Sequence, residues 1–267
     1  MMMTIPTGIP TPCNTEGHGM QTKNNLRRVL LIPDAHCPYH DKRALEGLII
    51  GKVLPAFTWD TICILGDFWD NYSISSHLKT PTRETSWMKE SECVKRLIRQ
   101  ITKVPATRRI LIKGNHERWL ERALSDKIPA LYDEVMAKTK DPNGWETVEY
   151  MDSTMIGKLH VTHDLGHSGL TSAQQSLAAC GDNIVIGHNH NLTYVVRGNA
   201  QGECHVGASF GWLGDYRKID YRHRMRSRRD WVLGFGVGYM EPSGIIHLQP
   251  VPIIKYKCVI EGQLFQA

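Results

Sequence analysis

Strand-length apolar runs alternate with helix-like segments along most of the chain, and this alternation constrains the fold more than any other feature of the sequence. Strands are expected at residues 28–32, 61–65, 109–112, 159–162, 183–186 and 203–208. Because these runs are almost continuously apolar, they are typical of strands that are buried on both faces. The sequence therefore predicts an α/β fold with largely parallel strands.

Helix-like segments lie between several of these runs. The clearest is 86–103, in which apolar residues recur at helical spacing, and further helices are expected at 42–53, 118–124, 130–138 and 170–179. The last third changes character, because 231–240 and 245–251 are strand-like, contain spaced glycines and are separated by the turn residues 242–244. We expect a hairpin or a second sheet there.

The composition is that of a globular protein. The chain has 267 residues, of which 41% are hydrophobic, and this is enough for one substantial core. We expect a mobile leader at 1–26 and one domain over 27–267, which includes a basic segment at 216–231 and the hairpin at 231–251. The leader lacks the apolar core of a signal peptide, and no apolar run approaches the ~18 residues of a membrane span. The seven cysteines show no CxxC spacing, which argues against a disulfide framework and a thiolate zinc site. A soluble, cytoplasmic protein is expected.

Each of the first five strands is followed at once by side chains that can bind a metal ion. Asp34 and His36 follow the first strand, Asp67 and Asp70 the second, Asn115 and His116 the third, His163 the fourth, and His188 and His190 the fifth. The carboxyl ends of adjacent parallel strands meet at one edge of a sheet. We therefore expect these side chains to be neighbours in space.

The ligand types indicate which ions such a site would take. Two carboxylates, one amide and four imidazoles suit Mn²⁺, Fe, Zn²⁺ or Ni²⁺ better than Ca²⁺, which prefers oxygen ligands alone. Seven ligands are too many for one ion. They suit two divalent ions about 3.5–4 Å apart that share a carboxylate, an arrangement that binds a phosphoryl group.

The ordered blocks resemble those of the calcineurin-like metallophosphoesterases, whose pattern is DxH, GDxxD, GNH(E/D), H and GHxH. All five occur here in that order between Asp34 and His190. Single blocks are weak signals, whereas the ordered set at strand ends is strong. The chain looks most like the small stand-alone phosphoesterases of bacterial and bacteriophage genomes. The resemblance implies an αββα sandwich of two facing mixed sheets flanked by helices, here with a β-rich C-terminal extension, in the cytoplasm of a bacterium or a phage-infected host.

The resemblance also implies a role for each site residue. Asp34, His36 and His190 would hold one ion, Asn115, His163 and His188 the other, and Asp67 would bridge them, with Mn²⁺ as the first expectation. A metal-bridging hydroxide would be the nucleophile. His116 would sit over the phosphoryl group and protonate the leaving oxygen. Asp70 would accept a hydrogen bond from the His116 ring and fix its orientation.

Some positions leave alternatives open. The family usually has His-Gly where this chain has His163-Asp164, so His160 and His167 compete with His163, although strand alternation places His163 at the strand end. Cys37 is either an extra ligand or a small buried side chain. Glu117 and Arg118 either contact substrate or open the next helix with favourable first-turn charge.

Four functions compete on the sequence. A protein Ser/Thr phosphatase of this superfamily would have Arg-Gly after GDxxD, where this chain has Asn71-Tyr72. A noncatalytic scaffold of the same fold would be expected to show broken ligand blocks, and none is broken. There remain a nuclease or phosphodiesterase that acts on nucleic acid, and a phosphoesterase that acts on small or cyclic nucleotides.

The distribution of charge favours the nucleic-acid substrate. The formal net charge is +5, and residues 217–230 alone contain seven basic and two acidic side chains. Tyr216 and Trp231 flank this segment, so cations for phosphates lie next to aromatic rings for base stacking. Arg222, Arg224 and Arg226 are the substrate-binding candidates for DNA or RNA. The alternative is a solvated basic loop.

Overall fold

The computed structural model describes residues 25–75, 86–139, 144–218 and 230–267. Two large sheets and one small sheet lie within these residues. The first sheet has the strand order β11-β10-β1-β2-β3-β4. Its strands are β1 (Arg27–Ile32), β2 (Trp59–Ile64), β3 (Ala106–Ile112), β4 (Glu146–Val148), β10 (Gly234–Met240) and β11 (Ile246–Pro252). Strands β1 to β4 are mutually parallel, and β10 and β11 are antiparallel to their neighbours.

The second sheet has the order β5-β6-β7-β9-β8 and is also mixed. Its strands are β5 (Ser153–Ile156), β6 (Leu159–Thr162), β7 (Ile184–Ile186), β8 (Leu192–Gly198) and β9 (Cys204–Phe210). Strands β6, β7 and β9 are parallel, whereas β5 and β8 pair antiparallel at the two edges.

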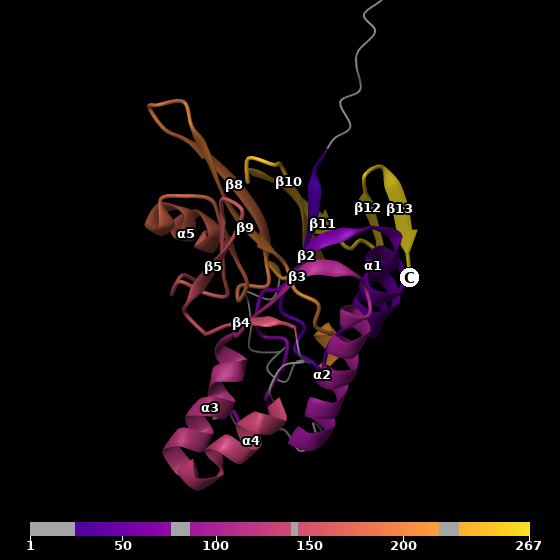
Figure 1. The fold of residues 1–267 in the computed structure, drawn as a ribbon, viewed down its shortest axis with the longest axis vertical. Helices are drawn as coiled ribbons and strands as arrows, with labels where there is room; N and C mark the ends of the chain where they lie inside the picture. Colours follow the sequence, from indigo (N-terminus) through magenta and orange to yellow (C-terminus); the bar gives the residue numbers. More distant parts are fainter. Residues whose placement is uncertain (1–24, 76–85, 140–143, 219–229) are drawn as a thin grey trace, which may run out of the picture.

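Helices flank the two sheets (Figure 1). They are the π-helix η1 (Arg43–Val53), α1 (Leu54–Ala56), α2 (Trp87–Thr102), α3 (Asn115–Lys127), α4 (Tyr132–Thr139) and α5 (Ser172–Cys180), with short 3-10 turns η2 (Pro129–Leu131) and η3 (Tyr216–Lys218). Helix α5 lies beside the second sheet, η1 and α2 lie beside the first, and α3 and α4 lie together beyond the ends of the strands. The five helices expected from the sequence are therefore present.

Alternation along β1 explains how the layers stack. Leu30 and Ile32 belong to the apolar cluster shared with η1 and α2, whereas Val29 and Leu31 belong to the cluster between the two sheets. All four side chains are fully buried. A strand with two buried faces reads as a continuous apolar run, as the sequence predicted. The structure confirms an α/β architecture of two mixed sheets flanked by helices.

The C-terminal part contributes strands to the first sheet. The predicted hairpin forms as β10 and β11, and β10 pairs along β1 from Arg27↔Met240 to Leu31↔Gly236. The further hairpin of β12 (Lys257–Ile260) and β13 (Gln263–Gln266) packs Cys258, Ile260 and Phe265 into the cluster under η1. The choice of β1 as partner depends on a contact between residues about 200 positions apart, which local patterns do not encode.

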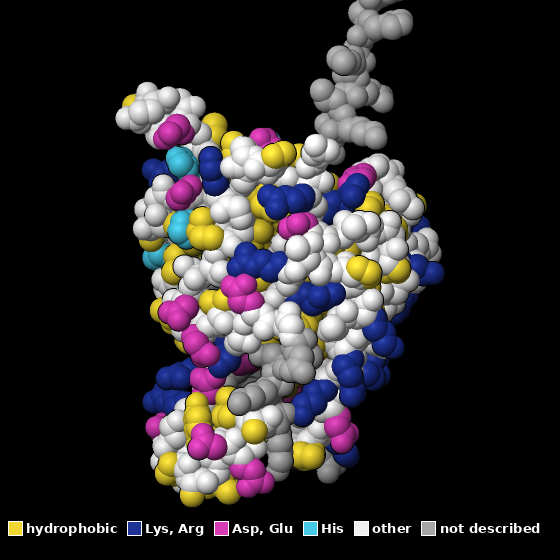
Figure 2. Space-filling model, viewed as in Figure 1, with side chains coloured by type: hydrophobic (Ala, Val, Ile, Leu, Met, Phe, Trp, Pro, Cys, Tyr) yellow, Lys and Arg dark blue, Asp and Glu magenta, His cyan; other side chains and the backbone are white. Residues whose placement is uncertain are grey.

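Charged side chains of both signs are spread over the face shown in Figure 2. On the face shown, Lys and Arg side chains gather along the right edge, over η1 and α2. Part of this charge is compensated, because Arg96 of α2 forms an ion pair with Glu46 of η1 at 2.7 Å. Basic side chains therefore lie on the helical layer as well as in the basic segment.

Candidate metal centre

The loops that follow parallel strands of both sheets meet at one edge of the sandwich. Within the first sheet, the N–H groups of Ala35 and His36 donate to the carbonyl of Asp67, at 3.1 and 2.9 Å. Between the sheets, the N–H of His188 donates to Asp34 Oδ1 at 3.2 Å. The edge predicted for one sheet is therefore shared by two, and all seven expected ligands lie there.

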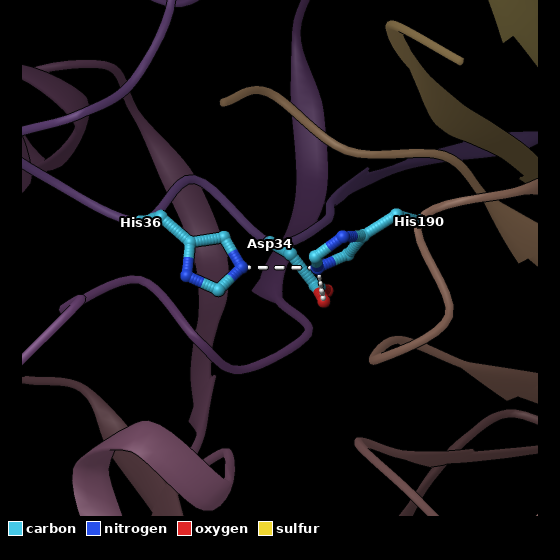
Figure 3. A group of neighbouring side chains, drawn as sticks. All are labelled: Asp34, His36 and His190. Carbon is cyan, nitrogen blue, oxygen red and sulfur yellow. Dashed lines mark hydrogen bonds and ion pairs between the residues drawn. The ribbon is translucent and has the colours of Figure 1, made fainter. Parts of the chain in front are cut away.

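A first ligand group consists of Asp34, His36 and His190, whose ligand atoms all lie within 4.8 Å of one another (Figure 3). The Nε2 atoms of the two histidines are 3.0 Å apart, and His190 Nε2 is 3.2 Å from Asp34 Oδ2. His36 Nδ1 donates to the Asp70 carboxylate at 3.1 Å, which leaves Nε2 to present its lone pair to the group. Asp34 Oδ2 is buried and accepts no hydrogen bond in the described structure. These donors fit a divalent transition-metal ion.

A second ligand group consists of Asp67, Asn115, His163 and His188. His163 Nδ1 donates to the Leu65 carbonyl at 2.8 Å, so His163 Nε2 faces Asn115 Oδ1 at 3.2 Å and Asp67 Oδ2 at 3.4 Å. His188 Nδ1 lies 2.8 Å from the same Asn115 oxygen. Ring nitrogens and oxygens that converge in this way make a second site suited to a cation.

Electrostatics favour a positive charge at the centre. Burial raises the pKa of Asp67, but the adjacent His116 and His163 outweigh it and hold the pKa well below its usual range. Burial lowers the pKa of His163, but the Asp67 charge reverses this and raises the pKa to about 10. Likewise burial lowers the pKa of His36, while the Asp70 hydrogen bond and the Asp67 charge raise it to about 9. The centre therefore stabilises the ionised form of Asp67 and the positively charged forms of His163 and His36.

The backbone at the centre is held in an uncommon conformation. His36, Asp67, His188 and His190 all have φ between 46° and 67°, in the left-handed region that non-glycine residues rarely adopt. Such residues persist only where the surrounding structure holds them, and they cluster at functional sites. The left-handed turns redirect the chain at the strand ends and bring side chains to the same edge.

Two glycines of the motifs are required by close approach. A Cβ at Gly114 would lie 2.1 Å from Asp67 Oδ1, and a Cβ at Gly66 would lie 2.3 Å from His163 Nδ1. Gly66 also has a φ of 99°. Glycine is therefore needed before Asn115 because the Asp67 carboxylate packs directly on Gly114, and before Asp67 because the His163 ring packs directly on Gly66.

His116 lies between the two ligand groups, and its orientation differs from the expectation in one respect. Its Nδ1 donates to the main-chain carbonyl of Asp70 at 2.6 Å, whereas the Asp70 carboxylate lies 3.5 Å away. The carboxylate is nearer to His36, at 3.1 Å. Asp70 thus orients two histidines, because its carboxylate accepts the hydrogen bond from His36 and its main-chain carbonyl accepts the one from His116. Burial lowers the pKa of His116.

The alternative ligands lie at different places in the structure. Among the described residues, the candidate metal groups contain His163 and neither His160 nor His167. Cys37 is fully buried in the core cluster and belongs to none of these groups. Burial raises the pKa of its thiol well above the usual value, as for a structural cysteine.

Glu117 and Arg118 have different surroundings. The buried Glu117 carboxylate accepts hydrogen bonds from the N–H groups of Asp67, Trp69 and Gly114, at 3.1, 2.9 and 2.7 Å. It therefore fastens the loop after β2 to the start of α3. Burial and the Asp67 charge raise its pKa to about 7. Arg118 is exposed and pairs with Glu121 within α3 at 2.8 Å.

Trp212 belongs to the centre and was missed from the sequence. Its ring stacks on that of His190, with centroids 5.1 Å apart and planes at 20°. Trp212 follows β9, a strand predicted from the sequence and parallel to β7. The rule that identified the other site residues, a position just after a parallel strand, would have identified it.

The basic segment is only partly described. Arg222, Arg224 and Arg226 lie outside the described residues. The residues that flank the segment are described and close together, because the Tyr216 hydroxyl donates to the Trp231 carbonyl. Trp231 lies against His190, with ring centroids 4.3 Å apart. Both ends of the basic segment therefore lie at the candidate metal centre.

Comparisons with known proteins give a distant structural similarity. No protein-family model matches the chain, and no curated protein matches its sequence. Among solved structures, the chain is similar to the NAD nucleotidase of Haemophilus influenzae, with 12% sequence identity and a TM-score of 0.41. The match covers 86% of this chain and 50% of the nucleotidase chain, so the chain spans about half the length of that protein.

Within the described part of the chain, no helix is both long enough and apolar enough to cross a membrane.

Proposed function

We propose that the chain is a phosphoesterase that works with two divalent metal ions. The observation that carries this proposal is the convergence of loops from both sheets into two adjoining ligand groups. Asp67 belongs to the second group with His163 and His188, and its ligand atom also lies within 4.8 Å of His36, a member of the first group, in a set that includes His116. A carboxylate shared between two cation sites is the arrangement that binds and activates phosphoesters.

Each ligand has a proposed role. Asp34, His36 and His190 would hold one ion, Asn115, His163 and His188 the other, and Asp67 would bridge them. When bound, the two ions would polarise the phosphoryl group and lower the pKa of the attacking water. Mn²⁺ is the first candidate, with Fe, Zn²⁺ and Ni²⁺ as alternatives.

His116 is the proposed acid. Because the Asp70 carbonyl can only accept, His116 Nδ1 carries the hydrogen of their bond, and Nε2 is the atom that holds or releases the working proton. His116 Nε2 lies 3.8 Å from Asp67 Oδ2, so it faces the position between the two ligand groups. From there it would stabilise charge on the phosphoryl group and protonate the leaving oxygen.

The proposed substrates are nucleotide phosphoesters. Phosphodiesters of nucleic-acid type come first, because the basic segment ends at Trp231, which lies against His190, and begins at Tyr216, whose hydroxyl donates to the Trp231 carbonyl. Small or cyclic nucleotides are the second candidate, because the same pair of ions serves monoesters and diesters.

A substrate panel tests the function. Hydrolysis of an aryl phosphodiester, an aryl phosphomonoester, a cyclic nucleotide and single- and double-stranded DNA is measured with Mn²⁺, Zn²⁺ or chelator, using Asp67→Ala as the inactive control. Metal-dependent cleavage of DNA that fades as salt rises would support a nuclease. Turnover of the small esters alone would support a nucleotide phosphoesterase. Bound metal without any activity would contradict the proposal and favour a noncatalytic scaffold.

A further inference from the structure

We propose that Trp231, backed by Trp212, is a stacking platform for a nucleobase of the substrate. This inference rests on the proposed function and names the substrate class, which is a phosphoester that carries a nucleoside next to the reacting phosphorus. The platform adjoins His190, a member of the first ligand group. In a nucleotide the base is one sugar ring away from the phosphate, so a phosphate at the centre would place its base near this residue.

The rings of His190, Trp212 and Trp231 pack against one another. Trp212 is 3% exposed and stacks on His190. The Trp231 ring is nearly perpendicular to the His190 ring, at 80°, and its centroid lies 4.9 Å from that of Trp212, with the two planes at 59°. Trp231 is half-buried and therefore more exposed than Trp212. Trp212 therefore packs on the buried side of the platform, and Trp231 is the ring that a ligand can contact.

Main-chain hydrogen bonds hold the two tryptophans and His190 in place. The N–H of Val232 donates to the carbonyl of His190 at 3.0 Å, and the N–H of Trp212 donates to the carbonyl of Val232 at 3.0 Å. Gly214 provides the seat for the Trp212 ring, because a Cβ there would lie 2.0 Å from a ring atom. A platform fixed before binding loses little conformational entropy when a base stacks on it.

Stacking predicts a definite pattern of specificity. Every base has a π-face, so the platform should distinguish nucleoside esters from simple alkyl esters and should discriminate little among the four bases. An unpaired base can stack on Trp231, whereas a base inside a duplex is already stacked on its neighbours. The platform thus favours mononucleotides and single strands over duplexes.

Two esters with the same leaving group test the platform. Values of kcat/KM are measured for thymidine 5′-(p-nitrophenyl phosphate) and for methyl p-nitrophenyl phosphate, with wild type, Trp231→Ala and Trp231→Phe. We expect the preference for the nucleoside ester to fall roughly 5- to 150-fold in Trp231→Ala, mainly through KM, and to be largely retained in Trp231→Phe. Tyr194→Ala removes a 41% exposed aromatic ring from β8 and should leave the preference unchanged. Equal losses on both esters, or an unchanged preference, would overturn the proposal.

Direct binding separates this inference from the proposed function. Calorimetric titrations compare thymidine 5′-monophosphate, methyl phosphate, oligo(dT) and a DNA duplex on the wild type and on Trp231→Phe and Trp231→Ala, each with Mn²⁺ or chelator. Binding of thymidine monophosphate that weakens in Trp231→Ala supports the platform even if no ester is hydrolysed, in which case the proposed function alone fails. Tighter binding of oligo(dT) than of the monophosphate would identify a polymer substrate, and the reverse order a small nucleotide. Binding that is indifferent to residue 231 would overturn the platform.

Discussion

Asp67 and His116 are neighbours at the centre, yet the structure gives them different tasks. Asp67 Oδ1 accepts the N–H of His116 at 3.0 Å, while Oδ2 faces His163 at 3.4 Å and His116 Nε2 at 3.8 Å. Asp67 Oδ1 therefore fastens the start of α3, and Oδ2 is the oxygen that faces the proposed ions. The His116 ring has none of the proposed ligand roles, and it is held by the Nδ1 hydrogen bond and by packing on Trp119, with ring centroids 3.9 Å apart.

Removing each side chain should therefore have a distinct signature. We expect Asp67→Ala to lower the bound metal below two ions per chain, because the shared carboxylate is lost. We expect His116→Ala to keep both ions and to reduce turnover about 10²- to 10⁴-fold, the usual contribution of a positioned acid. Metal content by plasma mass spectrometry and kcat on an aryl diester check both. Loss of metal in His116→Ala would show that this division of roles is wrong.

Glu117 should contribute to stability more than to chemistry. In Glu117→Ala three buried N–H groups, those of Asp67, Trp69 and Gly114, lose their acceptor. Each such loss costs about 1–3 kcal/mol, so we expect the free energy of unfolding of the metal-free protein to fall by about 3 kcal/mol or more. Arg118→Ala is the matched control and should cost about 1 kcal/mol or less, because the Arg118 side chain is exposed and Glu121 keeps Lys113 as a partner at 2.7 Å. Urea denaturation measures both, and equal losses would contradict the role assigned to Glu117.

At the scale of elements, η1 and α2 are joined by a charged cluster that responds to acid. Glu46 of η1 lies 2.7 Å from Arg96 of α2 and 2.9 Å from the fully buried His40. The hydrogen bond from Arg96 lowers the pKa of Glu46 from its usual 4.5 to about 2, with His40 adding to the effect. A carboxyl whose pKa is lower in the folded state stabilises the fold above its unfolded pKa and loses this effect as pH falls.

The excess stability of the wild type over Glu46→Gln should therefore depend on pH. We expect it to be fully present at pH 7, to begin to decline near pH 4.5 and to be largely gone near pH 2. Urea midpoints of both proteins at pH 7, 4 and 3 give the difference. Glu92→Gln, on an exposed position of α2, is the control. A difference that grows as the pH falls would contradict the assignment.

Strong local patterns predicted the long strands and helices. Elements with weak patterns, and the pairing of strands, could not be predicted. The expected strands 28–32, 61–65 and 109–112 correspond to β1, β2 and β3, whose apolar runs are buried on both faces. The edge strand β8 was missed because four of its seven residues are exposed and it lacks a long apolar run. Helix α3 was expected from residue 118 but begins at Asn115, since the motif residues themselves form its first turn.

At the scale of the whole molecule, the candidate centre could be predicted as a set of residues but not as a junction between sheets. Strand-end positions selected the seven proposed ligands, and the structure brings these residues to one edge. They did not indicate that Asp34, Asp67 and Asn115 come from one sheet and the histidines after β6 and β7 from the other. That arrangement follows from packing Val29 and Leu31 against Val161 and Val185 across the interior, a contact between distant parts of the chain.

Because the centre joins two sheets, metal should stabilise the entire fold. Ligands from both sheets exist in this geometry only in the native state, so ions bind the folded chain in preference to the unfolded chain. At metal concentrations of 100 Kd the gain is about 2.7 kcal/mol for each site that binds independently. For a domain of this size, this corresponds to a rise in Tm of roughly 5–10 °C per site.

Calorimetric scans with Mn²⁺ and with chelator measure the shift in the wild type. In Asp67→Ala the shift should be much smaller, while His116→Ala should retain it. A Tm that is indifferent to chelator in the wild type, under conditions where metal is bound, would show that the ions lie at the surface and do not join the sheets.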